Sequence, residues 1–332
     1  MTHTNIGRRP RAITASGGFS LIELLVSVAV LMIISGTALT GVLNLTKASR
    51  TISNRTEMHA GVRNATELLQ QEVGQAGRIT LTPGITLAQD VAPAATTFVV
   101  NSVVGLFVGQ YLVIGTGGNM TCSAGCEETV QVSAIDAGTK IITIVTDAAL
   151  TKGHREFWGA HAAGTPVRIA GGFAAGVVPK APAFTNGSTA TVLKIFGDIN
   201  DDGNMVYIEY KCDVAAGNLY RRSMAYDSLT KPAISADQAL LNNILANPDG
   251  SDCFTYQERT VSGTTFVVDV AVTLTVQTPD KDPVTGLFQK ETKALLNVSP
   301  RNVFNVWQLA GLGLGYRVQP VPPSVTALLA LP

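Results

Sequence analysis

Charged residues and histidines are scarce in this 332-residue chain. Charged residues make up 14% of it, the formal net charge is zero, and there are 4 histidines. Apart from Arg8, Arg9 and Arg11, no basic cluster in the sequence is larger than the pair Arg221-Arg222. Counterion release from nucleic acid needs clustered Lys and Arg. The composition therefore argues against a nucleic-acid partner.

Recognisable catalytic motifs are also missing. The sequence has no nucleophile elbow, no phosphate-binding loop and no H-E-x-x-H helix. His59 falls within a helical pattern and is interpreted as a solvated surface residue. The triplet His154-Arg155-Glu156 is interpreted as polar surface rather than as a catalytic site. We therefore predict that the protein is not an enzyme.

Cysteine is limited to four positions: Cys122, Cys126, Cys212 and Cys253. In a domain outside the cytoplasm an even number of cysteines suggests disulfides, although four cysteines permit three pairings. We favour Cys122–Cys126 together with Cys212–Cys253. The alternative is a metal site completed by His154 and His161, but its spacing does not match that of a usual zinc site.

The chain has one long hydrophobic run, close to its N-terminus. From Phe19 to Leu43 the sole charged side chain is Glu23, whereas residues 1–17 are polar and carry three arginines. About 25 residues, at a rise of about 1.5 Å each, make a helix long enough to cross the core of a bilayer. A positively charged flank stays in the cytoplasm, so we place the rest of the chain on the other side of the membrane.

Two ordinary explanations of this hydrophobic run fall short. A secretory signal would have a shorter apolar core that ends at a small-x-small cleavage site. A plain membrane anchor explains the length and the positive flank. It does not explain a carboxylate near the start of the run, which is costly in hydrocarbon unless it is paired.

The residues GFSLIELL, from Gly18 to Leu25, resemble the class III signal of type IV prepilins and type II secretion pseudopilins. The resemblance rests on Gly before the cut, Phe after it, and Glu as the fifth residue of the mature chain. It implies that a prepilin peptidase cleaves between Gly18 and Phe19, removes residues 1–18 as a leader, and methylates the new amine of Phe19.

The same resemblance gives Glu23 a role in assembly. Its carboxylate would pair with the Phe19 ammonium of a neighbouring subunit, because both charges are poorly solvated among apolar helices. The alternative is that Glu23 lies at the level of the lipid headgroups and contacts water.

The helical pattern continues beyond the hydrophobic run. Apolar residues recur there at steps of three and four and so share one helical face: Met58, Val62, Ala65, Leu69, Val73 and Ala76. Pro83-Gly84 prevents much continuation. We predict one helix over residues 19–78, transmembrane over 19–43. Gly36 and Gly41 stand where many major pilins have a mid-helix proline.

Short strands and Gly-rich turns follow the helix. A first set of strands, assigned to an inserted β module at 79–180, is predicted at 96–100, 111–114, 129–133, 140–146 and 166–169. A second set, assigned to a C-terminal head at 181–316, is predicted at 191–196, 205–212, 218–224, 264–277 and 289–298. A helix is assigned to 236–246, a turn to 283–286, and the tail at 317–332 has no assignment.

The fold class that follows is α+β and pilin-like. A long N-terminal α-helix, transmembrane in its first half, packs on an antiparallel β-rich head with a β-module insertion. The second half of the chain resembles the PilW family of minor pilins, through Gly197–Gly203, Tyr207–Tyr210, Leu219–Arg222 and Pro300–Asn302. No family match is evident over residues 90–180.

These resemblances imply a minor pilin that primes or caps a type IV pilus. The large head favours a low copy number near the tip. The alternatives are a pseudopilin of a type II secretion system, and a pilus-tip adhesin whose module at 90–180 binds a surface. The expected location is the inner membrane, crossed once with a periplasmic head, and then the pilus filament. Expected partners are the prepilin peptidase, other pilins and minor pilins, and a PilY-type tip protein.

One loop has the composition of a cation site. Asp198, Asn200, Asp202 and Gly203, followed by Glu209, fit the EF-hand loop formula. The flanking residues alternate like strands, however, and an extended chain would put Glu209 roughly 20 Å away at about 3.3 Å per residue. We interpret the segment as an Asp/Asn/Gly turn. The alternative is a calcium-binding hairpin loop with the Asp198, Asn200 and Asp202 side chains as ligands; no other cofactor is expected.

Overall fold

The structure is a computed structural model of the chain, and it describes residues 18, 20–115, 127–147, 157 and 159–332. Phe19, Cys122, Cys126 and His154 lie outside the described residues. The chain divides into two compact units. One comprises Met1–Asn54 with Lys281–Leu287, and the other comprises Arg55–Asp280 with Phe288–Pro332.

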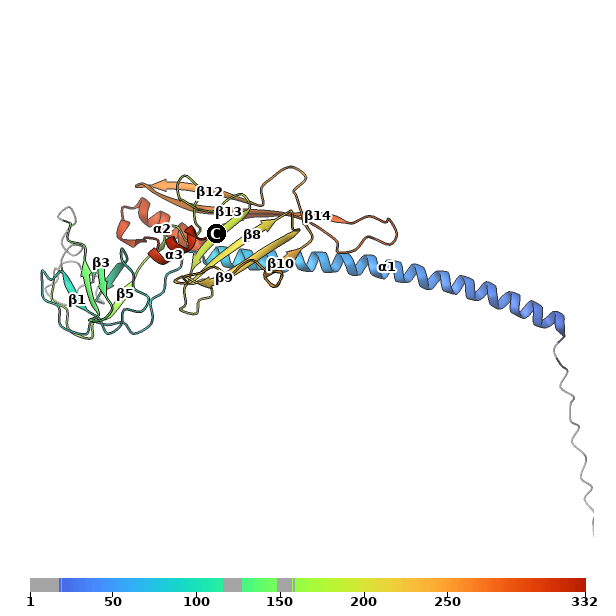
Figure 1. Cartoon of the computed structure of the whole chain (residues 1–332), viewed down its shortest axis with the longest axis horizontal. Helices are drawn as coiled ribbons and strands as arrows, with labels where there is room; N and C mark the ends of the chain where they lie inside the picture. The colour runs from blue at the N-terminus through green and yellow to red at the C-terminus, as the bar shows by residue number, and fades with distance from the viewer. Residues whose placement is uncertain (1–17, 19, 116–126, 148–156, 158) are drawn as a thin grey trace, which may run out of the picture. The chain divides into compact units, whose positions relative to one another are not determined.

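The predicted N-terminal helix is confirmed. Helix α1 runs without interruption from Leu21 to Gln75, over 55 residues (Figure 1). At about 1.5 Å per residue it is roughly 80 Å long. Gly77 follows the helix with a positive φ of 82°, a conformation that glycine adopts without steric cost.

In the first unit, the segment Lys281–Leu287 forms the turn predicted at 283–286. Asp282 Oδ1 accepts hydrogen bonds from the backbone N–H groups of Val284 (2.7 Å) and Thr285 (3.2 Å). The backbone N–H of Gly286 donates to the Asp282 carbonyl at 2.7 Å. An Asp before such a turn satisfies backbone donors that no strand would pair.

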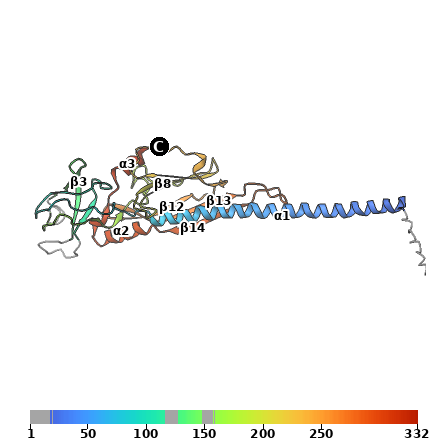
Figure 2. The same ribbon diagram turned by 90° about the horizontal axis from the view of Figure 1, so that it is seen from below.

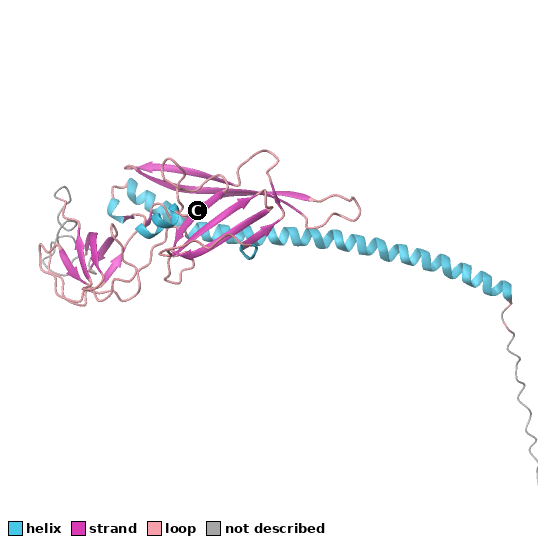
Figure 3. Cartoon of the chain, in the orientation of Figure 1, coloured by secondary structure: helices cyan, strands magenta, loops and turns pink. Residues whose placement is uncertain are grey.

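The predicted first set of strands forms an antiparallel sheet in the order β1-β4-β3-β2-β5. Figure 3 draws the strands of the chain in magenta. Its strands are β1 (Thr97–Val99), β2 (Tyr111–Ile114), β3 (Glu128–Asp136), β4 (Ile141–Ile144) and β5 (Val167–Ile169). A hydrophobic cluster of its own, which includes Leu112, Val130 and Ile142, packs beneath this sheet. The domain boundaries proposed from the sequence stay predictions.

Two four-stranded sheets follow in the described part of the chain. The first has the order β10-β9-β8-β7 and consists of β7 (Val192–Gly197), β8 (Val206–Asp213), β9 (Asn218–Ala225) and β10 (Ala239–Asn242). In the second sheet, each of the other three strands pairs with β13. Its strands are β11 (Ile244–Leu245), β12 (Phe254–Val261), β13 (Thr264–Gln277) and β14 (Lys290–Val298).

The prediction of a helix at 236–246 is wrong. The segment contains a single 3₁₀ turn, η1 (Ala236–Gln238), followed by β10 and β11. Leu241 and Ile244 are buried in the main core, and β11 pairs with β13. Strand pairing and burial outweigh the weak local preference for helix.

The C-terminal part of α1 packs into this core. Its buried apolar residues lie on the face that the three- and four-residue spacing predicted: Met58, Val62, Ala65, Leu69 and Val73. Ala76, just after the helix, is buried with them. They contact apolar side chains of both sheets, among them Ile195 and Val270. Figure 2 shows β12, β13 and β14 alongside this part of the helix. Each fully buried Leu or Val contributes about 1.5–3 kcal/mol relative to an exposed one.

The last part of the chain is ordered structure that the sequence did not reveal. It consists of α2 (Arg301–Gly311), η2 (Gly315–Arg317), β15 (Val318–Gln319) and α3 (Pro323–Ala330). Strand β15 pairs in parallel with β6 (Gly172–Phe173). Helix α3 begins with proline, which suits the first helical position, and buries Val325, Leu328 and Leu329.

Candidate functional site

The start of α1 is organised by a local cap. Ser20 Oγ accepts a hydrogen bond from the backbone N–H of Glu23 at 3.2 Å, and the Ser20 carbonyl accepts from Leu24 at 3.1 Å. Ser and Glu three residues apart are the sequence of a capping box. The Glu23 carboxylate lies in the first turn, where the helix dipole favours negative charge. The residues that resemble a processing signal therefore also begin the helix.

The first part of α1 exposes a continuous apolar surface. It contains a stretch long and apolar enough to cross a membrane, and none of that stretch is buried. Leu21, Met32 and Leu45, for example, are 83%, 68% and 73% exposed. Soluble monomers rarely expose apolar patches of this extent. This surface therefore needs lipid or other apolar helices around it.

The predicted disulfide between Cys212 and Cys253 is confirmed. It joins β8 to the residue before β12, with Cα atoms 6.4 Å apart and a sequence separation of 41. It therefore links the two sheets that enclose the core. The second predicted bridge, Cys122–Cys126, lies outside the described residues.

In the loop with the composition of a cation site, the Asp198 carboxylate binds groups of the protein itself. Asp198 is 1% exposed and accepts hydrogen bonds from Thr80 Oγ1 (2.6 Å) and from the backbone N–H of Asp202 (3.1 Å). Arg78 Nε lies 3.9 Å from Asp198 Oδ2, the oxygen that accepts from Thr80, and Arg78 also pairs with Asp201. Asp198 thus anchors the segment that follows α1.

The other polar side chains of this loop have different surroundings. Asn200 is exposed, and Asp202 Oδ1 accepts from the backbone N–H of Asn204 at 2.8 Å. Glu209 is engaged by basic residues of the head. Within the described part of the chain, no group of three or more His, Cys, Asp or Glu side chains could hold a metal ion. Calcium ligation by Asp198, Asn200 and Asp202 stays a prediction.

His161, part of the alternative metal site, lies between β4 and β5. It is buried, and its Nε2 lies 3.0 Å from Glu128 Oε1, which also accepts from the backbone N–H of Gly159 at 2.8 Å. Three other candidate ligands of that site lie outside the described residues: Cys122, Cys126 and His154.

A buried ion pair that the sequence did not predict joins α1 to the head. Glu72 on α1 receives hydrogen bonds from the Tyr210 hydroxyl and from Arg221 Nε, the latter at 3.1 Å to each carboxylate oxygen. Burial, and then the adjacent Glu72 charge, raise the pKa of Tyr210, so its hydroxyl stays a donor. The two partners are 149 residues apart in sequence, so no local pattern signals the pair.

A second buried carboxylate, Glu209 on β8, faces the other side of the same sheet. It accepts hydrogen bonds from Lys231 Nζ (2.8 Å), Arg222 Nε (2.7 Å) and the Tyr207 hydroxyl. Burial opposes its ionisation, yet the hydrogen bonds from Lys231 and Tyr207 and the charges of Lys231 and Arg222 hold the pKa of Glu209 below its usual value.

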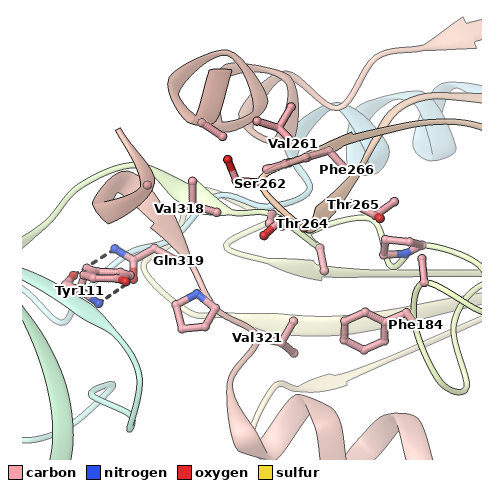
Figure 4. Close-up of a pocket in the computed structure, with 18 of the residues that line it drawn as sticks. Tyr111, Phe184, Val261, Ser262, Thr264, Thr265, Phe266, Val318, Gln319 and Val321 are labelled. Atoms are coloured by element: carbon pink, nitrogen blue, oxygen red, sulfur yellow. Dashed lines mark hydrogen bonds between the residues drawn. The ribbon is translucent and has the colours of Figure 1, made fainter. Parts of the chain in front are cut away.

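A pocket of about 510 Å³ lies among β2, β3, the turn between β12 and β13, and the C-terminal segment (Figure 4). At one end the Gln319 side chain accepts from the Tyr111 N–H and donates to the Tyr111 carbonyl, both at 3.0 Å. The side chains of the described residues that line the pocket are all uncharged.

Comparison with known proteins gives one match. A family model described as the prokaryotic N-terminal methylation motif matches residues 13–39. No curated protein and no solved structure matches the chain. The match covers Gly18, Glu23 and the apolar start of α1. The motif indicates a structural precursor of the type IV pilin or pseudopilin kind. A prepilin peptidase processes such a precursor, and the subunit assembles with other pilins. The apolar N-terminal helix fits an anchor in the membrane.

Proposed function

We propose that the protein is a minor pilin of a type IV pilus. A prepilin peptidase cleaves it after Gly18 and methylates Phe19, and α1 then holds it in the inner membrane with the head in the periplasm. The subunit next enters a filament, where it primes or caps assembly. One observation carries this proposal: the methylation motif runs directly into a 55-residue helix whose first part exposes an apolar surface.

Glu23 is the residue on which assembly depends in this proposal. It is the one charged side chain between Phe19 and Leu43. In hydrocarbon an unpaired carboxylate is costly, and a charge on the partner removes that cost. The methylated amine of Phe19 in a neighbouring subunit supplies that charge and thereby fixes the register of the two helices.

The size of the head supports a minor rather than a major subunit. The β module has a five-stranded sheet and a hydrophobic core of its own, added to the two sheets that pack on α1. A subunit of this bulk on every step of a filament would crowd its surface. We therefore place it at low copy number near the tip, in a role like that of the PilW family and with a PilY-type protein as its partner.

Mass spectrometry of the N-terminal peptide tests the processing step. The protein purified from its native membrane should begin at Phe19 with an N-methyl group. Retention of Met1 would show that the leader stays in place. A cut beyond residue 40 would remove the first part of the helix. Either result contradicts the proposal.

Deletion of the gene separates a minor pilin from a type II secretion pseudopilin. We expect loss of surface pili with normal protein secretion, and restoration of pili by the wild-type gene. Quantitative mass spectrometry of sheared filaments should find far fewer copies of this chain than of the major subunit. Loss of secretion with normal pili would support the pseudopilin instead.

A further inference from the structure

Three basic side chains surround the buried Glu209 carboxylate. Lys194, Arg222 and Lys231 have side chains that are 13%, 11% and 3% exposed, and that of Glu209 is 4% exposed. Each of the ion pairs that these three cations form in the described structure goes to Glu209. One carboxylate therefore faces three cations in a place that water reaches poorly.

This arrangement leaves an excess of positive charge. A buried charge without a counter-charge is unfavourable, because desolvation is not repaid by attraction. Burial, and repulsion from Lys231 and Arg222, lower the pKa of Lys194 despite the attraction of Glu209. The Tyr207 hydroxyl, whose pKa burial raises, remains neutral and adds no negative charge.

Lys194 also has hydrogen-bond donors to spare. An ammonium group carries three N–H donors. One of them donates to the Asn186 carbonyl at 2.8 Å. Glu209 Oε1 lies 3.9 Å from Nζ, which is too far for a hydrogen bond. By contrast, Lys231 also donates to the Leu331 carbonyl (2.8 Å), and Arg222 also donates to an oxygen of Pro332 (3.4 Å).

The three cations line a cavity of about 460 Å³. Asn186, Thr189 and the last residues of the chain complete its wall. This volume falls within the range of small-molecule sites, which runs from about 300 to 1,000 Å³. The cavity therefore combines room for a ligand with unbalanced positive charge and unused donors.

The geometry points to an anion-binding site in this cavity, in which Lys194 Nζ, together with Arg222 and Lys231, binds a small oxyanion such as a carboxylate, sulfate or phosphate group. An oxyanion there would lie against these positive side chains and accept the remaining Lys194 donors in charge-assisted hydrogen bonds. This inference goes beyond the proposed function and does not depend on it.

Calorimetric titration of the full chain in detergent tests the site, with sodium sulfate and sodium acetate as probes at constant ionic strength. We expect saturable binding of at least one of the two anions. Lys194→Gln should weaken that binding by about tenfold or more, since a hydrogen bond to a charged group is worth about 1.5 kcal/mol or more. Lys194→Arg, which keeps the charge, should bind within a few-fold of the wild type.

Lys211→Gln is the matched control. Lys211 lies on β8, pairs with Asp213 at 3.0 Å, and is 42% exposed, so its loss should leave anion binding unchanged. Absence of saturable heat with both anions would overturn the proposal, as would equal binding by the wild type and Lys194→Gln. Binding that occurs only after removal of Leu331 and Pro332 would also overturn it, because the chain itself would then fill the site.

Discussion

The adjacent arginines Arg221 and Arg222 have different partners because they lie on a strand. Successive side chains of β9 point to opposite faces of the sheet. Arg221 therefore pairs with Glu72 on α1, and Arg222 pairs with Glu209 on β8. A pair that looks like a small basic cluster in the sequence thus serves two separate buried carboxylates.

Loss of one partner of the Glu72–Arg221 pair should destabilise the head strongly. We expect Arg221→Leu to lower the free energy of unfolding by about 3–5 kcal/mol, because the Glu72 charge stays buried without its partner. The double variant Glu72→Gln/Arg221→Leu should recover much of that loss. Chemical denaturation of the full chain in detergent, followed by near-ultraviolet circular dichroism, measures both.

Arg63→Leu is the control for this pair. Arg63 and Glu67 form an exposed ion pair one helical turn apart on α1, with side chains that are 78% and 62% exposed. Exposed pairs contribute little to stability. An equally large loss in Arg63→Leu, or a double variant no more stable than Arg221→Leu, would contradict the role given to the buried pair.

The Glu209 carboxylate should make the head sensitive to acid. Its pKa in the folded protein is lower than its ordinary value of 4.5. The unfolded chain therefore binds this proton first, and the stability that ionised Glu209 contributes is lost as the pH falls below about 4.5 through the folded pKa. Stability measured from pH 7 to pH 3 should fall less steeply in Glu209→Gln, which is less stable at pH 7. Parallel profiles for the two proteins would be inconsistent with this role.

At the scale of elements, the junction after α1 depends on a close approach of backbones. A Cβ at Gly77 would lie 2.8 Å from Val303 Cγ2 and 3.0 Å from the Phe173 carbonyl oxygen, at a positive φ. Gly74, one turn earlier, has open space at the corresponding position. The helix can therefore accept a side chain at one glycine but not at the other.

We expect opposite effects from alanine at these two glycines. Gly77→Ala should destabilise the head by more than about 1 kcal/mol, from the positive φ and the contacts with Val303 and Phe173. Gly74→Ala should stabilise it by up to about 1 kcal/mol, because alanine favours a helix. Thermal unfolding of the two variants compares them directly. Equal melting temperatures would contradict the close packing at Gly77.

The disulfide should be the strongest single constraint between the two sheets. A bridge that closes a loop of about 40 residues stabilises by about 4 kcal/mol in the chain-entropy estimate. Cys212→Ser/Cys253→Ser should therefore lower the denaturant midpoint markedly under oxidising conditions. With a reductant present, the wild type should approach the variant. If the reductant frees both thiols of the wild type and its denaturant midpoint does not change, this contribution is contradicted.

At the scale of the whole molecule, processing and assembly should separate at Glu23. Glu23→Ala keeps Gly18 and Phe19, so we expect normal cleavage and methylation by mass spectrometry. Incorporation into filaments should be strongly reduced, because the amine of a neighbouring subunit loses its counter-charge. Glu57→Ala, which removes an exposed acid farther along α1, should assemble normally. Normal incorporation of Glu23→Ala would contradict the assembly role.

The sequence by itself determined the features that depend on local pattern. The apolar run and the three- and four-residue spacing predicted α1 within a few residues. Alternation between turns predicted most strands, including β2 and β13 at their observed bounds. The processing signal is likewise local, since a peptidase reads consecutive residues. Cys212–Cys253 belongs to the pairing favoured among the three that the sequence permits, and the fold forms this bridge with the two Cα atoms 6.4 Å apart.

Only the tertiary structure decided the remaining features, because they depend on contacts between distant parts of the chain. Pairing with β9 and β13 turned the predicted helix at 236–246 into strands. Burial against Phe173 and Phe196 made a helix of the unassigned residues 323–330. The partners of Glu72 and Glu209, and the cavity beside Lys194, have no signature in the sequence. A buried charge is matched by whatever the fold places next to it, and that neighbour is set by sheet register and helix packing.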